Sequence, residues 1–270
     1  MIFADQHLHS AHSSDSETPM EVQIEAGIEA GLKYMCFTEH MDKDWPEVKD
    51  AGVIFELDTD AYYKHYLECR ERYKDRVELR FGVEYGFQRH LVQHNTEYVG
   101  SHPFDMVIGS QHLVDGVDVY LPEYFEGMEE KQAYGKYFEA LLESICLFDG
   151  YDICGHLDYV VRYGPNKNKF YNYGDYREVV DEILKQLIKR GKGIEVNTAG
   201  FRKLGDETNP CTDILKRYRE LGGEIITIGS DAHTKTSVAY DFCRAGTMLK
   251  ELGYEYYCLF KNRFPEFVDL

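Results

Sequence analysis

Histidine and carboxylate side chains recur at the ends of short apolar runs along this sequence. An HxH pair, His7 and His9, closes the first run, and an Asp-x-His pair, Asp231 and His233, closes a late one. Four of the intervening runs end in further residues of this kind: Glu39 and His40, Glu84, His112, and His156. Neutral imidazoles and carboxylates are ligands that suit Zn, Mn and Fe. The pattern therefore predicts a polynuclear metal site.

The spacing within the two pairs supports this prediction. Residues two apart on a strand point to the same side, about 6.5 to 7 Å from each other. Each pair can therefore serve one ion or two neighbouring ions. The seven cysteines include no CxxC motif, which argues against a closed structural zinc site and indicates reduced, structural thiols.

The apolar runs themselves are predicted to be seven strands that alternate with helices. The predicted strands are residues 2–6, 34–38, 77–83, 104–108, 151–154, 193–196 and 224–228. The predicted helices are residues 19–30, 60–73, 129–147, 176–190, 211–221 and 237–252, and residues 82–102 are expected to form a loop. This alternation implies parallel βαβ units, and its sevenfold repetition favours an α/β fold closed into a TIM-like barrel. Because the carboxyl ends of barrel strands open on one face, the histidines and carboxylates should share one rim.

Length, hydropathy and charge limit the class of protein. A single barrel domain over residues 1–270 is expected, because no linker or repeat divides the chain. No apolar run of about 18 residues and no leader-like start occur, so we expect a cytoplasmic protein. A net charge of −18 argues against a nucleic-acid partner. A phosphate pocket would need its own cations, and Arg162 and Arg202, which follow the fifth and sixth strands, are the candidates.

Six sequence blocks, taken in order, resemble the motifs of one known family. They are DQHLHS at 5–10 with SD at 14–15, FTEH at 37–40, GVE at 82–84, IGSQH at 108–112, GHLD at 155–158 and GSDAH at 229–233. Together they resemble the PHP (polymerase and histidinol phosphatase) family. The fourth and fifth blocks look like its histidinol-phosphatase branch.

The resemblance implies a distorted (β/α)7 barrel, the PHP fold, that holds three divalent ions, Zn, Mn or Fe. By matching position, the first ion would be held by His7, His9, Glu84 and Asp231; the second by Glu84, His112 and His156; and the third by Asp15, His40 and His233. Glu84 would bridge two ions. Asp15 is nominated by the resemblance alone.

The resemblance also implies an activity, the hydrolysis of L-histidinol phosphate to L-histidinol and phosphate in histidine biosynthesis. A metal-bridging hydroxide would attack phosphorus, with Asp231, Glu84 and His233 as catalytic residues. Arg162 and Arg202 would bind the phosphate. The proton donor to the leaving group stays open between Asp231 and Asp42.

Three alternatives remain at this point. The first is a PHP phosphoesterase that acts on nucleotides or another small phosphate ester. The second is an amidohydrolase-like barrel, and the third is a PHP module without catalytic activity. The acidic loop at 42–60 could cover the site and contact a substrate cation. The other five histidines are expected to be structural or surface residues: His12, His65, His90, His94 and His102.

Overall fold

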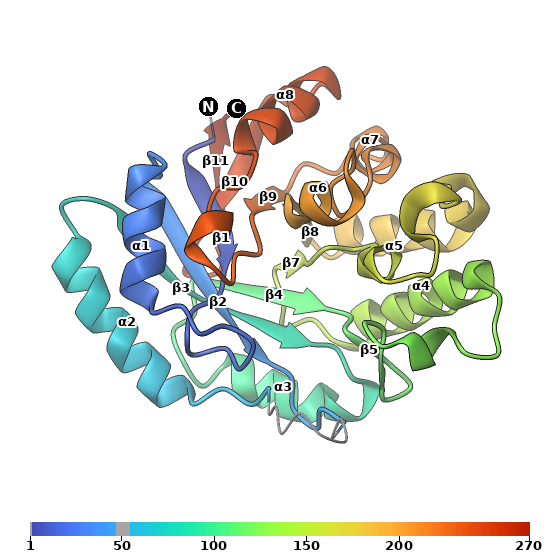
Figure 1. Cartoon of the computed structure of the whole chain (residues 1–270), viewed down its shortest axis with the longest axis horizontal. Coiled ribbons are helices and arrows are strands. Elements are labelled where there is room, and N and C mark those ends of the chain that lie inside the picture. The colour runs from blue at the N-terminus through green and yellow to red at the C-terminus, as the bar shows by residue number, and fades with distance from the viewer. Residues whose placement is uncertain (1, 47–54) are drawn as a thin grey trace.

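The computed structural model describes residues 2–46 and 55–270 and contains one sheet of seven parallel strands (Figure 1). The strands are β1 (Ala4–Leu8), β2 (Tyr34–Met41), β3 (Glu78–Gly86), β4 (Met106–Ser110), β7 (Ile153–Cys154), β8 (Gly193–Asn197) and β9 (Ile226–Gly229). Neighbouring strands follow the order of the chain. All seven predicted strands are confirmed, and most of them lie slightly later in the sequence than predicted. The predicted (β/α)7 fold class is likewise confirmed.

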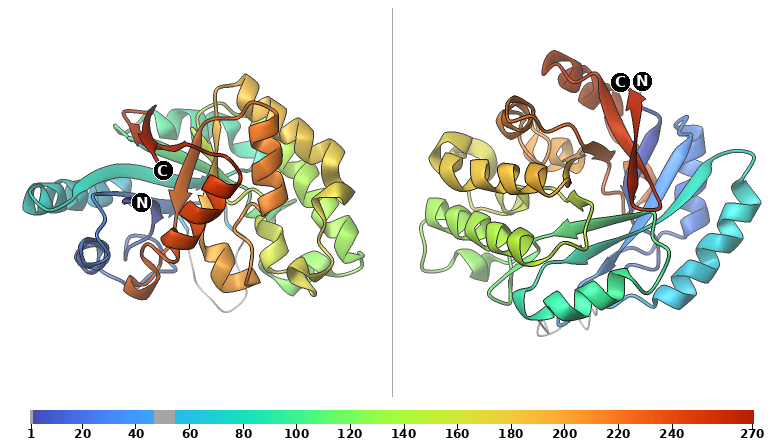
Figure 2. Two further views of the ribbon diagram at one scale, coloured as in Figure 1. Left: turned by 90° about the horizontal axis from the view of Figure 1, so that it is seen from above. Right: turned by 180° about the vertical axis from the view of Figure 1, so that it is seen from behind.

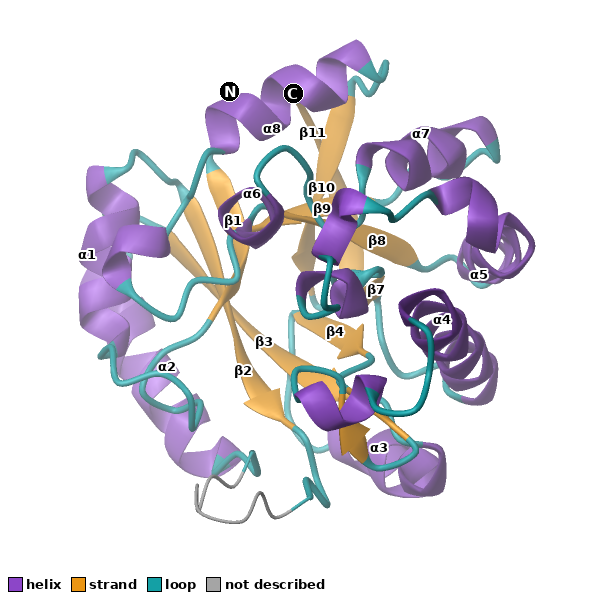
Figure 3. Cartoon of the chain, turned by 45° about the vertical axis from the view of Figure 1, so that its right-hand side comes forward, coloured by secondary structure: helices purple, strands orange, loops and turns teal. Residues whose placement is uncertain are grey.

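Helices form a layer outside these strands (Figures 1 and 3). They are α1 (Met20–Glu29), α2 (Thr59–Tyr73), α3 (Val92–Val99), α4 (Glu130–Leu147), α5 (Arg177–Lys189), α7 (Thr212–Glu220) and α8 (Phe242–Glu251). Helix α6 (Ala199–Leu204) lies instead at the carboxyl end of β8. None of the helices in the described part of the chain combines the length and apolar character needed to cross a bilayer.

Two short helices depart from the sequence prediction. The interval 82–102 is not a plain loop, because it contains the end of β3 and helix α3. Helix α3 spans only eight residues and fully buries only Asn95, while its apolar residues Val92, Tyr98 and Val99 are partly buried, so its apolar pattern is too short to reveal it. Helix α6 is a six-residue segment directly after β8. In the predicted 42–60 loop, residues 47–54 lie outside the described residues.

The barrel closes where its first strand meets the segment after its last strand. The backbone N–H of Asp231 donates to the carbonyl of His7 at 2.8 Å, and the N–H of His9 donates to the carbonyl of Ala232 at 2.9 Å. Leu8 and Ala232 form a parallel bridge between these hydrogen bonds. The two segments that carry the HxH and Asp-x-His pairs are therefore held side by side by backbone geometry.

A hairpin covers the end of the barrel at which the strands begin, as the rear view in Figure 2 shows. It consists of β10 (Tyr256–Lys261) and β11 (Phe264–Asp269). The amide of Gln6 in β1 donates to the carbonyl of Cys258 at 2.5 Å and accepts from the N–H of Phe260 at 3.1 Å. Cys258 and Phe260 pack with residues from the starts of β2, β4 and β7. A smaller hairpin, β5 (Leu113–Val114) and β6 (Val117–Asp118), follows β4.

Candidate metal centre

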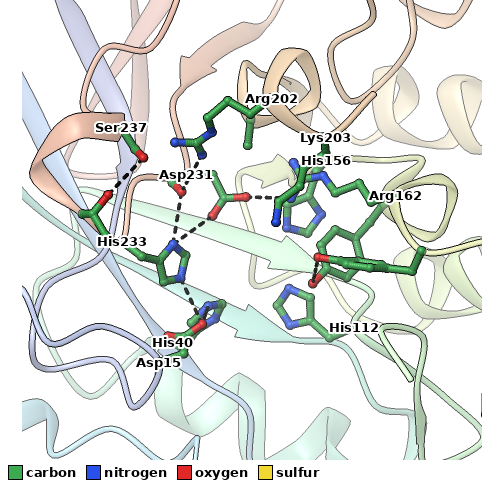
Figure 4. Close-up of a pocket in the computed structure, with 14 residues that line it drawn as sticks. Asp15, His40, His112, His156, Arg162, Arg202, Lys203, Asp231, His233 and Ser237 are labelled. Atoms are coloured by element: carbon green, nitrogen blue, oxygen red, sulfur yellow. Dashed lines mark hydrogen bonds and ion pairs between the residues drawn. The ribbon is translucent and has the colours of Figure 1, made fainter. Parts of the chain in front are cut away.

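The structure brings all nine residues predicted as metal ligands into one cluster at the carboxyl ends of the strands. Figure 4 shows six of them around a common space. The nine residues are His7, His9, Asp15, His40, Glu84, His112, His156, Asp231 and His233. Segments far apart in sequence thus supply one rim, as a parallel barrel requires.

Glu84, at the end of β3, lies at the centre of the cluster and is fully buried. Its Oε2 is 3.0 Å from Nε2 of His7 and 3.4 Å from Nε2 of His9. Its Oε1 is 3.3 Å from Nε2 of His112 and 3.0 Å from Nε2 of His156. Oε2 also lies 3.3 Å from Nδ1 of His40. The two oxygens of one carboxylate therefore face two different groups of imidazoles, an arrangement that suits a ligand shared by two ions.

The hydrogen bonds behind His7 and His9 determine which nitrogens are free to bind a cation. Nδ1 of His7 lies 2.6 Å from a carboxylate oxygen of Glu195 and donates its proton there. Nδ1 of His9 lies 3.1 Å from Oγ of Ser13, whose single hydrogen is donated to Glu39, so His9 is the donor in this pair. When both rings are neutral, the two Nε2 atoms, which lie 3.0 Å apart, present lone pairs, and Oε2 of Glu84 lies within 3.4 Å of each. A metal ion would be held by these three atoms, so the donor set fits a bound metal ion.

A third group of ligand-type atoms lies beside His9. Nε2 of His233 is 3.0 Å, and Nε2 of His40 is 3.6 Å, from Oδ2 of Asp15. The rings of His40 and His233 each stack on His9 with centroids 4.2 Å apart. Burial, together with these two neighbouring imidazoles, lowers the pKa of His9 to about 3. His9 is therefore neutral at physiological pH, which is the form that binds metal ions.

Asp231 has an unusual backbone conformation. Its φ of +53° lies in the left-handed region, which residues with a side chain seldom adopt and which is often found at functional sites. Oδ1 is 3.8 Å from Nε2 of His7 and 3.7 Å from Nε2 of His9. Oδ2 accepts hydrogen bonds from Arg162 at 2.9 Å and from Asn197 at 3.2 Å. The carboxylate thus has one oxygen toward the cluster and one fixed by the barrel wall.

The two central carboxylates are ionised despite their burial. Burial alone would raise the pKa of Glu84, but the imidazoles of His7 and His40 outweigh it and hold that pKa well below its usual range. Burial would also raise the pKa of Asp231, and His7 and Arg162 reverse the effect. The cluster therefore offers fixed negative charge at its centre.

A cavity of about 510 Å³ opens over the cluster. Its wall opposite Asp15 includes both arginines predicted to bind phosphate, together with Lys203, which the sequence analysis did not nominate. Arg162 is buried, and besides Asp231 it donates to Asn197 and Asn209, at 2.8 and 2.7 Å. Arg202 is half-buried and donates to the carbonyl of Ser230 at 3.1 Å. The cavity therefore pairs a carboxylate-rich floor with a cationic wall.

Two carboxylates that sequence reasoning missed in this role orient the imidazoles from behind. Glu195 in β8 accepts from Nδ1 of His7 and, at 2.9 Å, from the backbone N–H of His156. Asp42 lies 2.8 Å from Nδ1 of His112, and although burial opposes it, His112 lowers the pKa of Asp42. Asp42, one of the two predicted proton donors, faces this imidazole and not the cavity. The sequence signal that could have indicated this role of Glu195 is the presence of a glutamate inside an otherwise apolar predicted strand.

The five other histidines lie outside the cluster. His90 pairs with Asp44 and His102 with Asp60. His94 contacts Asn95. His12 and His65 contact each other between helices α1 and α2.

Fold and site together define a (β/α)7 barrel with a candidate metal centre at the carboxyl ends of its strands. The family model for the PHP domain matches residues 5–199. The chain belongs to the PHP domain family.

Relatives with known or assigned activities cover nearly the whole chain. The chain is 32% identical to the histidinol-phosphatase of Lactococcus lactis, over 93% of this chain and 91% of that protein. It is 34% identical to a probable histidinol-phosphatase of Clostridium acetobutylicum, with 91% of each chain covered. The crystal structure of the Lactococcus lactis histidinol phosphate phosphatase, in complex with zinc, L-histidinol and phosphate, matches with a TM-score of 0.88 over 97% of this chain and 98% of that one, at 31% identity.

Proposed function

We propose that this protein is a metal-dependent phosphomonoesterase that hydrolyses L-histidinol phosphate to L-histidinol and phosphate, a step of histidine biosynthesis. The observation that carries the proposal is the cavity that places Arg162 and Arg202 opposite the histidine and carboxylate cluster. The similarity to the Lactococcus lactis enzyme, which was crystallised with histidinol and phosphate, supports this substrate.

Three divalent ions, Zn, Mn or Fe, are the proposed cofactors. His7, His9, Glu84 and Asp231 would hold the first; Glu84, His112 and His156 the second; and Asp15, His40 and His233 the third. The separate directions in which the two Glu84 oxygens face support its shared role. Bound ions of this kind neutralise charge on phosphoryl oxygens and make a coordinated water more acidic.

The cationic wall of the cavity binds the phosphoryl group in this proposal. The guanidinium of Arg202 lies at the cavity edge, where it can form paired hydrogen bonds to two phosphate oxygens. Arg162 contributes charge and also fixes Asp231, because its Nη1 already donates to that carboxylate. Lys203 adds a third positive charge to the same wall.

Asp231 is the proposed proton carrier. It is ionised, and Oδ1 faces the cluster, so it can accept the proton that the attacking water loses. Transfer of that proton to the leaving oxygen assists bond cleavage, because an alkoxide is strongly basic. His233 lies 3.7 Å from Oδ1 of Asp231 and 3.0 Å from Asp15, so it positions both carboxylates. Glu84 acts through the ions that it would share.

We further propose that residues 1–270 act as one barrel domain in the cytoplasm, without a nucleic-acid partner. All seven cysteines are free, which suits a reducing compartment. The net charge of −18 disfavours binding to a phosphate backbone.

Phosphate release by the purified, metal-loaded protein tests the substrate assignment. We expect kcat/KM for L-histidinol phosphate to exceed that for nucleotides and sugar phosphates by about 10²-fold or more, since such discrimination needs contacts beyond the phosphate. Similar rates on all these esters would leave a general PHP phosphoesterase and remove the histidinol assignment. No hydrolysis of any ester would remove the phosphatase proposal itself.

A further inference from the structure

Helices α1 and α2 lie on the outside of the barrel (Figure 1), and a second cluster of ligand-type side chains lies between them. Glu21 lies in the first turn of α1, and His65 and Cys69 are four residues apart on α2. One carboxylate oxygen, one imidazole nitrogen and the thiol sulfur of these residues all lie within 4.8 Å of one another. Since residues four apart share one face of a helix, two elements direct three ligand atoms toward one point.

His12, in the segment between β1 and α1, orients the imidazole of His65. Nε2 of His12 lies 2.9 Å from Nδ1 of His65, and Nε2 of His65 lies 3.4 Å from a carboxylate oxygen of Glu21. When His65 is the donor in this hydrogen bond, its Nε2 presents a lone pair toward the Glu21 carboxylate. A hydrogen bond to the far nitrogen is the usual support of a metal-binding histidine.

The cluster is accessible, and the arginine that pairs with its carboxylate is weakly held. The side chains of His65 and Glu21 are 32% and 31% exposed, whereas Cys69 is buried. Arg72 pairs with Glu21 at 3.1 Å, but the arginine side chain is 58% exposed. Exposed ion pairs of this kind contribute little to stability, so a divalent ion can displace Arg72 from Glu21.

We propose that Glu21, His65 and Cys69 form a separate binding site for one thiophilic divalent cation, with Zn²⁺ as the fitting ion. A thiolate, an imidazole and a carboxylate form a ligand set that suits Zn²⁺, whereas Mg²⁺ and Ca²⁺ prefer oxygen ligands alone. Ligand atoms around tetrahedral zinc lie about 3.3 to 3.8 Å apart, so side-chain movements of roughly 1 Å complete the site. The ion displaces the thiol proton of Cys69, and water takes the fourth position.

Occupancy of this site would link two helices and one catalytic segment. The ion joins α1 to α2 directly. Through the hydrogen bond from His65 to His12 it also restrains the segment between His9 and Asp15, both of which belong to the candidate metal centre. The site is therefore a cross-link outside the barrel and not a part of the cavity.

Absorption spectroscopy of the full chain loaded with Co²⁺ tests the proposal. A thiolate bound to Co²⁺ gives a charge-transfer band in the near ultraviolet, and every ligand proposed for the catalytic cluster is nitrogen or oxygen. We expect this band in the wild type and in Cys243→Ser, which alters an exposed cysteine on α8. We expect its loss in Cys69→Ser, and one fewer bound zinc ion per chain in His65→Gln.

The proposal is overturned if the wild type lacks the band at saturating Co²⁺, or if the band persists in Cys69→Ser. Because Cys69 is buried and its serine variant could fold poorly, His65→Gln provides the second arm at a partly exposed position. An unchanged zinc content and an unchanged Co²⁺ affinity in His65→Gln would likewise overturn it. This result does not depend on whether the protein hydrolyses L-histidinol phosphate.

Discussion

Replacement of Glu195 by glutamine tests how the barrel wall fixes the candidate metal centre. One oxygen of Glu195 accepts the Nδ1 proton of His7, and the other accepts from the N–H of His156 and from the amide of Asn197. Glutamine has nearly the same shape but offers one acceptor oxygen and one NH₂ group. Its NH₂ group must therefore face at least one buried donor.

The more damaging arrangement places the glutamine NH₂ against Nδ1 of His7. His7 can then accept that bond only by moving its proton to Nε2, the atom that faces Glu84 and His9. A protonated Nε2 cannot bind a cation. The alternative leaves the N–H of His156 unpaired, at a cost of about 1 to 3 kcal/mol. Loss of such an orienting carboxylate typically lowers metal affinity or activity about 10- to 100-fold, or about 1.4 to 2.7 kcal/mol.

We expect Glu195→Gln to show this loss both in zinc affinity, measured by competition with a chelator, and in kcat/KM for L-histidinol phosphate. Glu178→Gln makes the same chemical change at an exposed position on α5 and should leave both quantities unchanged. Thermal unfolding of the metal-free proteins separates a loss of fold from a loss of binding. Wild-type zinc affinity together with wild-type kcat/KM in Glu195→Gln would refute the argument that Glu195 sets the tautomer of His7.

Three further predictions follow from the same site. Arg162→Lys should lower kcat/KM about 10²-fold, because lysine cannot reproduce the three-way contact that orients Asp231, and near-normal steady-state kinetics would contradict this. Exhaustive chelation should abolish phosphate release, and readdition of Zn²⁺ should restore it; full activity of the chelated protein would oppose a metal requirement. Free Zn²⁺ at about 1,000 times its Kd should also raise the free energy of unfolding by about 4 kcal/mol. Gly229→Ala should destabilise the protein by about 1 to 3 kcal/mol in denaturant unfolding, because a Cβ there would overlap His7 and Glu195. In the control variant Gly246→Ala on α8, the new Cβ meets only ordinary contacts, so the free energy of unfolding should not fall.

Sequence patterns predicted the barrel well because its strands are short buried runs that alternate with longer helices. The same logic missed helix α3, whose apolar residues are only partly buried, and the β10–β11 hairpin. Strand β11 is largely exposed, and the apolar residues that β10 buries lie against the far end of the barrel. Neither feature is visible from local periodicity, because each depends on what the segment packs against.

The candidate site was predictable where it depended on strand position. The ends of β1, β3 and the segment after β9 had to share a rim once the sheet was parallel and closed. Glu195 was harder to nominate as a supporting residue, because its role depends on which side of β8 it faces and on a 2.6 Å contact with His7. Asp42 illustrates the same limit, since only the structure places it behind His112 and away from the cavity.

The hydrogen bonds that close the barrel also determine when, during synthesis of the chain, the candidate metal centre can form. Ser230 binds Asp5 across 225 residues of sequence, and the backbone of Asp231 pairs with that of His7. At about 5 to 20 residues per second of translation, the first strand waits roughly 10 to 45 s on the ribosome for these partners. The complete ligand cluster cannot exist in any nascent chain that stops before His233. Metal loading of the finished centre is therefore a late event, after nearly the whole polypeptide has been synthesised.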